Sequence, residues 1–168
     1  MSVIDRLAAT PEILRLLMED VPEEIAVEKP APDRWSIAEV LEHLSHVEGH
    51  VFRARLDLIL DENEPEVEPY DEKAYDAAGT YSGRDPEESF AHWEEQREDT
   101  IELLRDLPEE VLNRVAVHPE IGPFTLDNLL HDWACHDLGH VRQIAELVRA
   151  GALLSETGPL AQKYNLRP

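Results

Sequence analysis

The sequence of 168 residues contains a single cysteine, Cys135, and few segments that resemble β-strands. One cysteine cannot form a disulfide within its own chain, and its small side chain favours a buried position over a reactive thiol. No segment approaches the roughly 18 consecutive apolar residues of a membrane-spanning helix. The first residues lack the basic and apolar regions of a signal peptide, so we expect a cytoplasmic protein.

Basic residues are also scarce, since 15 Lys and Arg face 37 Asp and Glu and give a formal net charge of −22. A surface of this charge repels nucleic-acid phosphates and anionic lipid headgroups, so we expect neither nucleic acid nor a membrane as a partner. It does not prevent the binding of cations. The apolar fraction of 42% and the length of the chain predict one folded domain over residues 1–168.

Four long amphipathic patterns predict an all-α fold with helices at about residues 3–19, 36–60, 85–107 and 124–150. Thr10 and Pro11 predict an internal cap or kink in the first helix, and Gly151 predicts a left-handed turn after the last. Residues 115–124 favour a small hairpin or a turn. The long loop at about 63–84 either covers a substrate or is merely flexible, and the tail at about 155–168 has no periodic pattern.

Histidines gather on two of these helices. His136 and His140 are four residues apart, so both imidazoles leave the same face of the fourth helix. The second helix carries His43, His46 and His50. At about 100° per residue, His43 borders the apolar stripe, His50 lies slightly further out and His46 lies nearest to solvent.

Three histidines at the edges of two apolar stripes suit a shared metal ion. His43, His136 and His140 would supply three neutral imidazole nitrogens, which bind zinc, nickel, copper or iron, and would leave one coordination position open. The alternative is that each histidine is a hydrogen-bonded core residue. His131 points away from this pair on the fourth helix and is expected at the surface.

Two acidic residues interrupt the apolar stripes, Glu48 on the second helix and Asp137 on the fourth. Carboxylates are rarely buried without a partner. Arg55 lies two turns from Glu48 on the same face, so a buried ion pair between them is one interpretation. The other is that Glu48 orients a ligand imidazole and that Asp137 transfers protons beside a metal.

These residues together resemble the DinB-like superfamily of four-helix bundles. The resemblance is carried by two segments in the expected order. They are Trp35-Ser36 followed by Glu39, Leu41-Glu42-His43-Leu44 and Glu48, and then Phe124-Thr125-Leu126 leading to His136, Asp137, His140, Gln143 and Ile144. The resemblance implies a bundle with a long crossover connection and a divalent metal held by His43, His136 and His140. His46 and His50 are outside the pattern, and His50 remains a candidate auxiliary ligand.

Relatives of this kind include thiol-dependent transferases, a thiol-dependent isomerase and metal-dependent hydrolases. The resemblance therefore implies a metal-dependent enzyme, with zinc or nickel, that activates a small thiol or water for transfer or hydrolysis of a small-molecule substrate. A low-molecular-weight thiol is a candidate cofactor. The alternatives are a non-catalytic metal-binding or stress-response module, and a helical dimerisation domain whose histidines belong only to the core. Each of these alternatives is compatible with a homodimer.

Overall fold

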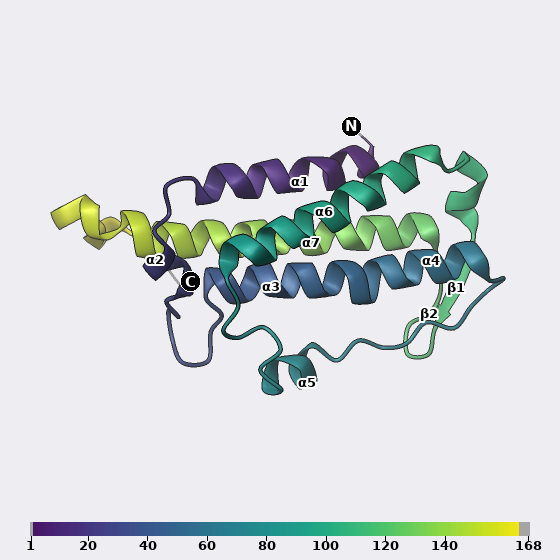
Figure 1. The fold of residues 1–168 in the computed structure, drawn as a ribbon, viewed down its shortest axis with the longest axis horizontal. Coiled ribbons are helices and arrows are strands. Elements are labelled where there is room, and N and C mark those ends of the chain that lie inside the picture. Colours follow the sequence, from purple (N-terminus) through teal and green to yellow (C-terminus); the bar gives the residue numbers. More distant parts are fainter. Residues whose placement is uncertain (1, 165–168) are drawn as a thin grey trace.

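The computed structural model describes residues 2–164, which are organised around four long helices (Figure 1). These are α1 (Val3–Met18), α3 (Ile37–Val47), α6 (Pro86–Asp106) and α7 (Leu126–Val148). A π-helical stretch, Glu48–Arg53, continues α3 into α4 (Ala54–Asp61). The fold is therefore the all-α four-helix bundle that the hydrophobic pattern predicts.

The order of the helices requires a long connection. The α3–α4 rod and α6 run in the same direction along the bundle, whereas α1 and α7 run in the opposite direction (Figure 1). The chain must return along the whole bundle between α4 and α6, and residues 62–85 make this crossover. The segment contains a short helix, α5 (Glu72–Ala77), none of whose residues is buried. This arrangement leaves the crossover lying along the side of α3.

Short elements close the two ends of the bundle. One end carries a 3₁₀ turn, Glu109–Asn113, and the antiparallel hairpin of β1 (Val115–His118) and β2 (Gly122–Thr125), so the predicted hairpin is present. The other end carries α2 (Glu23–Val27), the π-helical stretch Arg149–Leu153 and the 3₁₀ turns of Ser155–Lys163. The last four residues of the predicted tail lie outside the described residues.

Local capping sequences begin the helices that carry the histidines. The Ser36 hydroxyl accepts a hydrogen bond from the Glu39 N–H, and the Glu39 carboxylate accepts one from the Ser36 N–H. Thr125 and Asn128 form the same reciprocal pair at the start of α7. Such boxes satisfy amide groups that have no partner within the helix, so they set where each helix starts.

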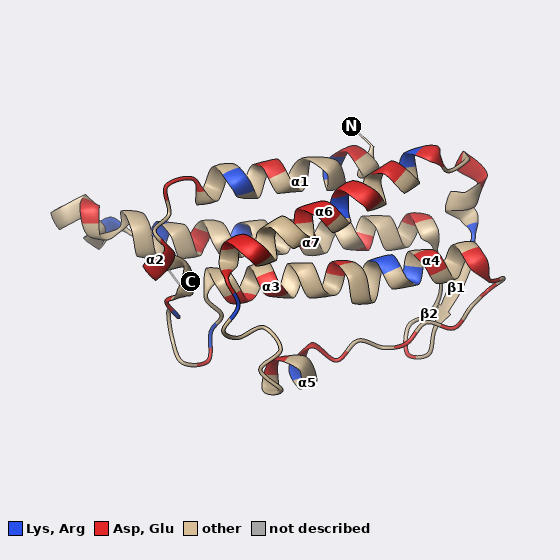
Figure 2. Ribbon diagram, in the orientation of Figure 1, with Lys and Arg blue, Asp and Glu red and all other residues tan. Residues whose placement is uncertain are grey.

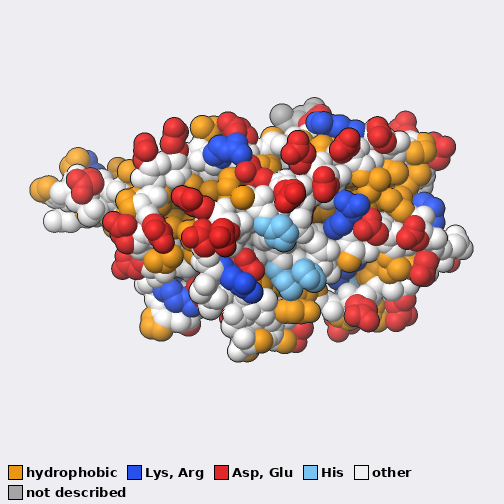
Figure 3. All heavy atoms as spheres, in the orientation of Figure 1, with side chains coloured by type: hydrophobic (Ala, Val, Ile, Leu, Met, Phe, Trp, Pro, Cys, Tyr) orange, Lys and Arg blue, Asp and Glu red, His pale blue; other side chains and the backbone are white. Residues whose placement is uncertain are grey.

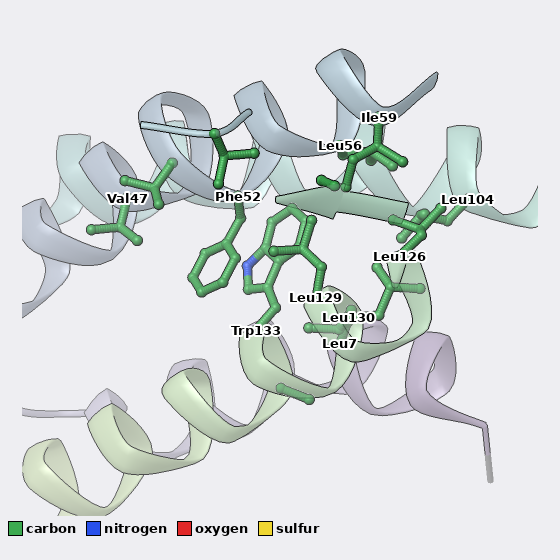
Figure 4. Packing of buried hydrophobic residues seen from close by; sticks show 14 of the residues in the cluster. Leu7, Val47, Phe52, Leu56, Ile59, Leu104, Leu126, Leu129, Leu130 and Trp133 are labelled. Atoms are coloured by element: carbon green, nitrogen blue, oxygen red, sulfur yellow. The ribbon is translucent and has the colours of Figure 1, made fainter. Parts of the chain in front are cut away.

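The core consists of two apolar clusters separated by polar groups. One surrounds Leu14, Leu41 and Trp93 near the α2 end, and the other surrounds Phe52 and Trp133 near the hairpin end (Figure 4). The rings of Phe52 and Trp133 stack with centroids 4.7 Å apart. Between the clusters, near the middle of the helices, lie four buried polar side chains, namely His43, Glu48, Arg97 and Asp137. Charged and imidazole side chains therefore lie in the interior of the bundle.

The outer faces of the helices are rich in acidic side chains, and basic ones are scattered among them (Figure 2). Within residues 2–164, no helix is long and apolar enough to cross a membrane. Acidic residues are thus mostly solvated surface groups, and the buried carboxylates Glu39, Glu48 and Asp137 are exceptions that require partners.

Two local predictions are wrong, and one of two alternatives is excluded for a third. The helix α1 runs from Val3 to Met18 with Pro11 inside it, so no internal cap divides it, which leaves a kink as the other predicted alternative. Cys135 is exposed, because it leaves α7 on the side away from the core. Gly151 lies inside a π-helical stretch and not in a left-handed turn. A Cβ atom at Gly151 would lie 2.6 Å from a methyl carbon of Ile25, so this glycine allows the close approach of α2.

Candidate metal centre

Three histidines from two helices meet inside the bundle. The Nε2 atom of His136 lies 3.1 Å from Nε2 of His43 and 3.2 Å from Nε2 of His140. One ligand atom of each residue lies within 4.8 Å of the others, and no fourth His, Cys, Asp or Glu joins this group among residues 2–164. The structure thus brings together the three histidines that the sequence analysis selected.

The spacing and the hydrogen bonds of these imidazoles suit a cation. Nitrogens held about 2.0–2.1 Å from a tetrahedral zinc ion lie about 3.3 Å from one another, close to the observed separations. His140 Nδ1 lies 2.9 Å from the amide oxygen of Gln143, which only accepts, so His140 carries its proton on Nδ1 and directs the Nε2 lone pair toward the cluster.

The other two imidazoles are incompletely bonded. The Nδ1 atoms of His43 and His136 are buried and have no hydrogen-bond partner within the described part of the chain. The nearest acidic atom to His136 Nδ1 is Oδ1 of Asp137 at 3.9 Å, which is beyond hydrogen-bond distance. Native proteins pair nearly all buried polar atoms, so these two Nδ1 atoms are exceptions, and no hydrogen bond at Nδ1 fixes the tautomer of His43 or His136.

Burial keeps two of the imidazoles neutral. Burial, reinforced by the neighbouring His140 and His136, lowers the pKa of His43 far below its ordinary value. Burial and the proximity of His136 lower the pKa of His140 to about 4. A neutral imidazole retains the lone pair that a metal ion needs, so at neutral pH these side chains are in the form that binds metal.

Aromatic rings surround the cluster. The indole of Trp35 lies 4.8 Å from the ring of His43 and is stacked nearly parallel to His140, with centroids 6.4 Å apart. The ring of Tyr81 meets His43 edge-on at 5.1 Å, and Phe52 meets His136 edge-on at 5.3 Å. These apolar walls keep water away from the back of the site and lower its local dielectric constant.

The crossover segment supplies part of this wall. Tyr81 is buried, and its hydroxyl is hydrogen bonded to that of Tyr70. Burial and this bond raise the pKa of Tyr81, so its phenol stays protonated. The indole N–H of Trp35 donates to Asp76 at 2.7 Å, and this hydrogen bond joins α5 to the wall of the site. The segment 63–84 therefore packs beside the histidines on the α3 side, and its predicted role in covering a substrate stays a prediction.

The order of exposure predicted for the other histidines of this helix is wrong. His50 is exposed and His46 is half-buried, with Tyr75 packed against it at 4.8 Å. The π-helical stretch from Glu48 has wider turns, which rotate His50 away from the core relative to an ideal α-helix. The Nδ1–H of His50 donates to the carbonyl of His46, and the ring lies outside the three-histidine cluster. His50 is therefore not positioned as an auxiliary ligand. Some histidine side chains reach the surface in the middle of the face shown in Figure 3.

A second buried cluster lies next to the histidines. The guanidinium of Arg97 on α6 donates two hydrogen bonds to Glu48, at 2.8 and 2.7 Å, and two to Asp137, at 2.6 and 3.2 Å. The predicted pair between Glu48 and Arg55 is wrong, because Arg55 donates to the carbonyl of Glu68 instead. Glu48 also accepts the indole N–H groups of Trp93 and Trp133 at 3.2 and 3.1 Å.

The two carboxylates of this cluster respond differently to burial. Burial raises the pKa of Glu48, although the charge of Arg97 opposes the rise. Burial opposes the ionisation of Asp137 as well, but Arg97 and His136 outweigh it and hold the pKa of Asp137 below its usual range. Every hydrogen-bond partner of these two carboxylates is an N–H group that donates to them, as expected for ionised carboxylates, which have no proton to donate.

Sequence reasoning missed Arg97. A signal was present, because Arg97 occupies a core-facing position between the buried residues Trp93 and Ile101 of α6. A charged residue at such a position requires a buried partner of opposite charge. Glu48 and Asp137 are acids that likewise require a buried partner of opposite charge. Pairing them with Arg97 requires the distances between the helices, which the sequence does not contain.

Comparison with known proteins agrees with this geometry. The model of the DinB superfamily matches residues 6–144, which includes all four long helices in whole or in large part. The chain belongs to the DinB superfamily. The four-helix bundle is therefore a family feature of this DinB protein.

Two relatives of this DinB protein carry names that mention a metal. YfiT of Bacillus subtilis, provisionally named a metal-dependent hydrolase, is 33% identical over 118 residues, which cover 68% of this chain and 65% of YfiT. A protein of Oceanobacillus iheyensis with the same provisional name is 28% identical over 149 residues, which cover 87% of this chain and 84% of the relative.

The solved structure of YfiT is described as a probable metal-dependent hydrolase with an unusual four-helix bundle topology. It superposes with a TM-score of 0.78 at 28% identity and covers 88% of this chain and 85% of YfiT. The superposition covers most of both chains, so this DinB protein and YfiT share the four-helix bundle fold.

Proposed function

We propose that His43, His136 and His140 bind one divalent metal ion and that the protein is a metal-dependent enzyme. The observation that carries this proposal is the convergence of three imidazole Nε2 atoms in one buried cluster. The names of the relatives support the same conclusion. Zinc and nickel are the ions we expect, since both accept imidazole nitrogen.

Three protein ligands distinguish a catalytic site from a structural one. Structural zinc sites usually have four protein ligands, whereas catalytic sites have three and leave a position for water or substrate. No fourth candidate ligand joins the cluster in the described part of the chain, and 23% of the His136 side chain is exposed. A bound divalent ion lowers the pKa of water or of a thiol and polarises carbonyl groups, which is the chemistry of hydrolysis and of thiol transfer.

The residues of this chain have separate tasks in the proposed site. Gln143 holds His140 in the tautomer that binds metal, through the 2.9 Å bond to Nδ1. Asp137 lies beside His136 Nδ1, where a small movement brings it to hydrogen-bond distance. Trp35, Tyr81 and Phe52 exclude water from the remaining sides. The substrate is a small molecule that activated water or a low-molecular-weight thiol attacks.

The metal content of protein produced without a histidine tag tests the binding step. We expect one zinc or nickel ion per chain, with absorption spectroscopy reporting about 2.0–2.1 Å to imidazole nitrogen for zinc. His140→Ala should lose stoichiometric metal, whereas His131→Ala should retain it, because the His131 side chain is 63% exposed and lies outside the cluster. Full metal content in the His140→Ala protein would refute the ligand assignment.

The catalytic step requires a second measurement. Metal-loaded protein should hydrolyse a model ester or amide, or transfer a small thiol to an electrophile, at a rate that chelation and the His140→Ala substitution both abolish. Stoichiometric metal without either activity across such a panel would favour the non-catalytic metal-binding module instead. Hydrolysis and thiol transfer are separated by whether the rate depends on added thiol.

A further inference from the structure

Arg97 is the most completely bonded charged residue of the bundle interior. Its side chain is 2% exposed, and a guanidinium has five N–H donors. Four of the donors reach Glu48 and Asp137, and the fifth contact is a 3.0 Å bond from Nη1 to the backbone carbonyl of Leu7. The faces of Trp93 and Trp133 lie 5.0 and 5.3 Å from the guanidinium carbon. One side chain of α6 thus contacts α1, the α3–α4 rod and α7.

The carbonyl of Leu7 is available because of a proline. In an α-helix the carbonyl of residue 7 accepts from the N–H of residue 11, but residue 11 here is Pro11, which has no N–H. The orphaned carbonyl faces the bundle interior and is satisfied by Arg97. The proline in the middle of α1 and the arginine in the middle of α6 therefore form one arrangement.

The two carboxylates that Arg97 holds belong to the helical segments that carry the proposed metal ligands. Asp137 directly follows His136 on α7, and Glu48 opens the π-helical stretch that follows His43. Arg97 is bidentate toward each carboxylate, and a bidentate pair constrains direction as well as distance. Its bonds therefore constrain both the spacing between the α3–α4 rod and α7 and the rotation of α7 about its axis.

We propose that Arg97 is a positioning residue for the metal centre, in that it holds His43 and His136 at the separation that one ion requires. This inference rests on the proposed function. Arg97 does not touch the imidazoles, so it acts through Glu48 and Asp137. Changes to groups that orient metal ligands typically reduce metal affinity about 10- to 100-fold, because the ligands then sample unproductive orientations.

The test compares Arg97→Lys with Arg53→Met. Lysine keeps the positive charge but loses the planar, bidentate geometry. Arg53 is an outer arginine of the α3–α4 rod, paired with Asp57 at 2.8 Å and 32% exposed, so its substitution controls for the loss of an arginine. We expect Arg97→Lys to weaken zinc binding, measured by competition with a chromophoric chelator, about 10- to 100-fold, and Arg53→Met to leave it unchanged.

A merely structural role makes a different prediction. If Arg97 only stabilises the bundle, Arg97→Lys lowers the melting temperature but leaves zinc affinity, measured well below that temperature, equal to the control. X-ray absorption adds a direct readout, since loss of positioning reduces the number of imidazole ligands from three to two. Unchanged affinity and three imidazoles in the folded Arg97→Lys protein overturn the inference.

A milder variant covers the case in which Arg97→Lys loses its helical circular dichroism. Trp93→Phe removes one N–H donor from Glu48 and reduces one aromatic wall of Arg97, while every proposed ligand remains. We expect a fewfold loss of zinc affinity, and an affinity equal to that of the wild type contradicts the inference. Wild-type protein without stoichiometric metal would instead refute the proposed function, so the two failures are distinguishable.

Discussion

Two buried polar clusters lie side by side in this bundle, and only one of them is complete. In the charged cluster, every N–H of Arg97 has an acceptor, and Glu48 accepts four donor contacts. In the histidine cluster, three Nε2 atoms face one another, and the Nδ1 atoms of His43 and His136 have no partner among residues 2–164. Neutral imidazoles can bring Nε2 lone pairs to this meeting point, so the second cluster is arranged for a cation that the protein itself does not supply.

The difference between the clusters separates stability from binding. The charged cluster joins all four long helices and needs no ligand, which is the arrangement of a structural network. The histidine cluster keeps neutral imidazoles away from solvent, which lowers the free energy of unfolding. A cation that binds the folded state would offset this loss. Substitutions in the first cluster should therefore change the fold, and those in the second should change the response to metal and to protons.

We expect the largest effect from a substitution that disrupts the charged cluster of Arg97, Glu48 and Asp137. Arg97→Met leaves Glu48 and Asp137 buried without their cation, and removal of one partner of a buried pair typically costs about 3–5 kcal/mol. We expect a loss of this size in the unfolding free energy of the metal-free protein, measured by urea denaturation. Arg53→Met should cost less than about 1 kcal/mol, because its partner is exposed. Equal losses in both variants would contradict the comparison.

The next effect concerns pH and the histidine cluster. Folding lowers the pKa of His140 from 6.5 to about 4, so the unfolded chain binds a proton more readily between these values. The stability of the metal-free protein is therefore fully present above pH 6.5 and declines as pH falls toward about 4, by up to about 3 kcal/mol from His140 alone.

Denaturation at several pH values measures this dependence. His140→Gln should make the decline shallower, and His131→Gln should leave it unchanged, because His131 is exposed on the far side of α7. A wild-type protein whose stability is constant between pH 6.5 and 4 would show that the imidazoles are not held neutral by burial.

A somewhat smaller effect concerns metal. An ion that binds only the folded state adds about 2.7 kcal/mol at a free concentration 100 times its dissociation constant. We expect a gain of this size for the wild type in thermal denaturation with zinc, and none for His43→Leu. Without zinc, His43→Leu should be as stable as the wild type or more so, since it removes an unpaired buried nitrogen. A gain that persists in this variant would place the ion on the acidic surface instead.

The smallest effect sharpens the difference inside the histidine cluster. Gln143→Ala removes the acceptor of the His140 Nδ1–H, so we expect zinc affinity to fall about tenfold, equivalent to about 1.4 kcal/mol. The neighbouring Arg142 is exposed, and Arg142→Ala should not change the affinity. Isothermal titration of both variants decides whether Gln143 orients the imidazole or only covers it.

The sequence by itself determined the features that depend on neighbours along the chain. The four-residue spacing of His136 and His140, the capping boxes of α3 and α7 and the hairpin before α7 all follow from local periodicity and local hydrogen bonds. The family resemblance supplied the crossover, since four helical patterns alone do not state the direction in which each helix runs.

Only the tertiary structure decided the partners of the buried groups. Arg97, not Arg55, meets Glu48, because the partner comes from a different helix whose distance the sequence does not contain. His50 rather than His46 is exposed, because a π-helical stretch changes the rotation per residue and Tyr75 covers His46. Local patterns repeat with a known period, whereas contacts between helices depend on packing in three dimensions, and this packing made one buried cluster complete and left the other to a ligand.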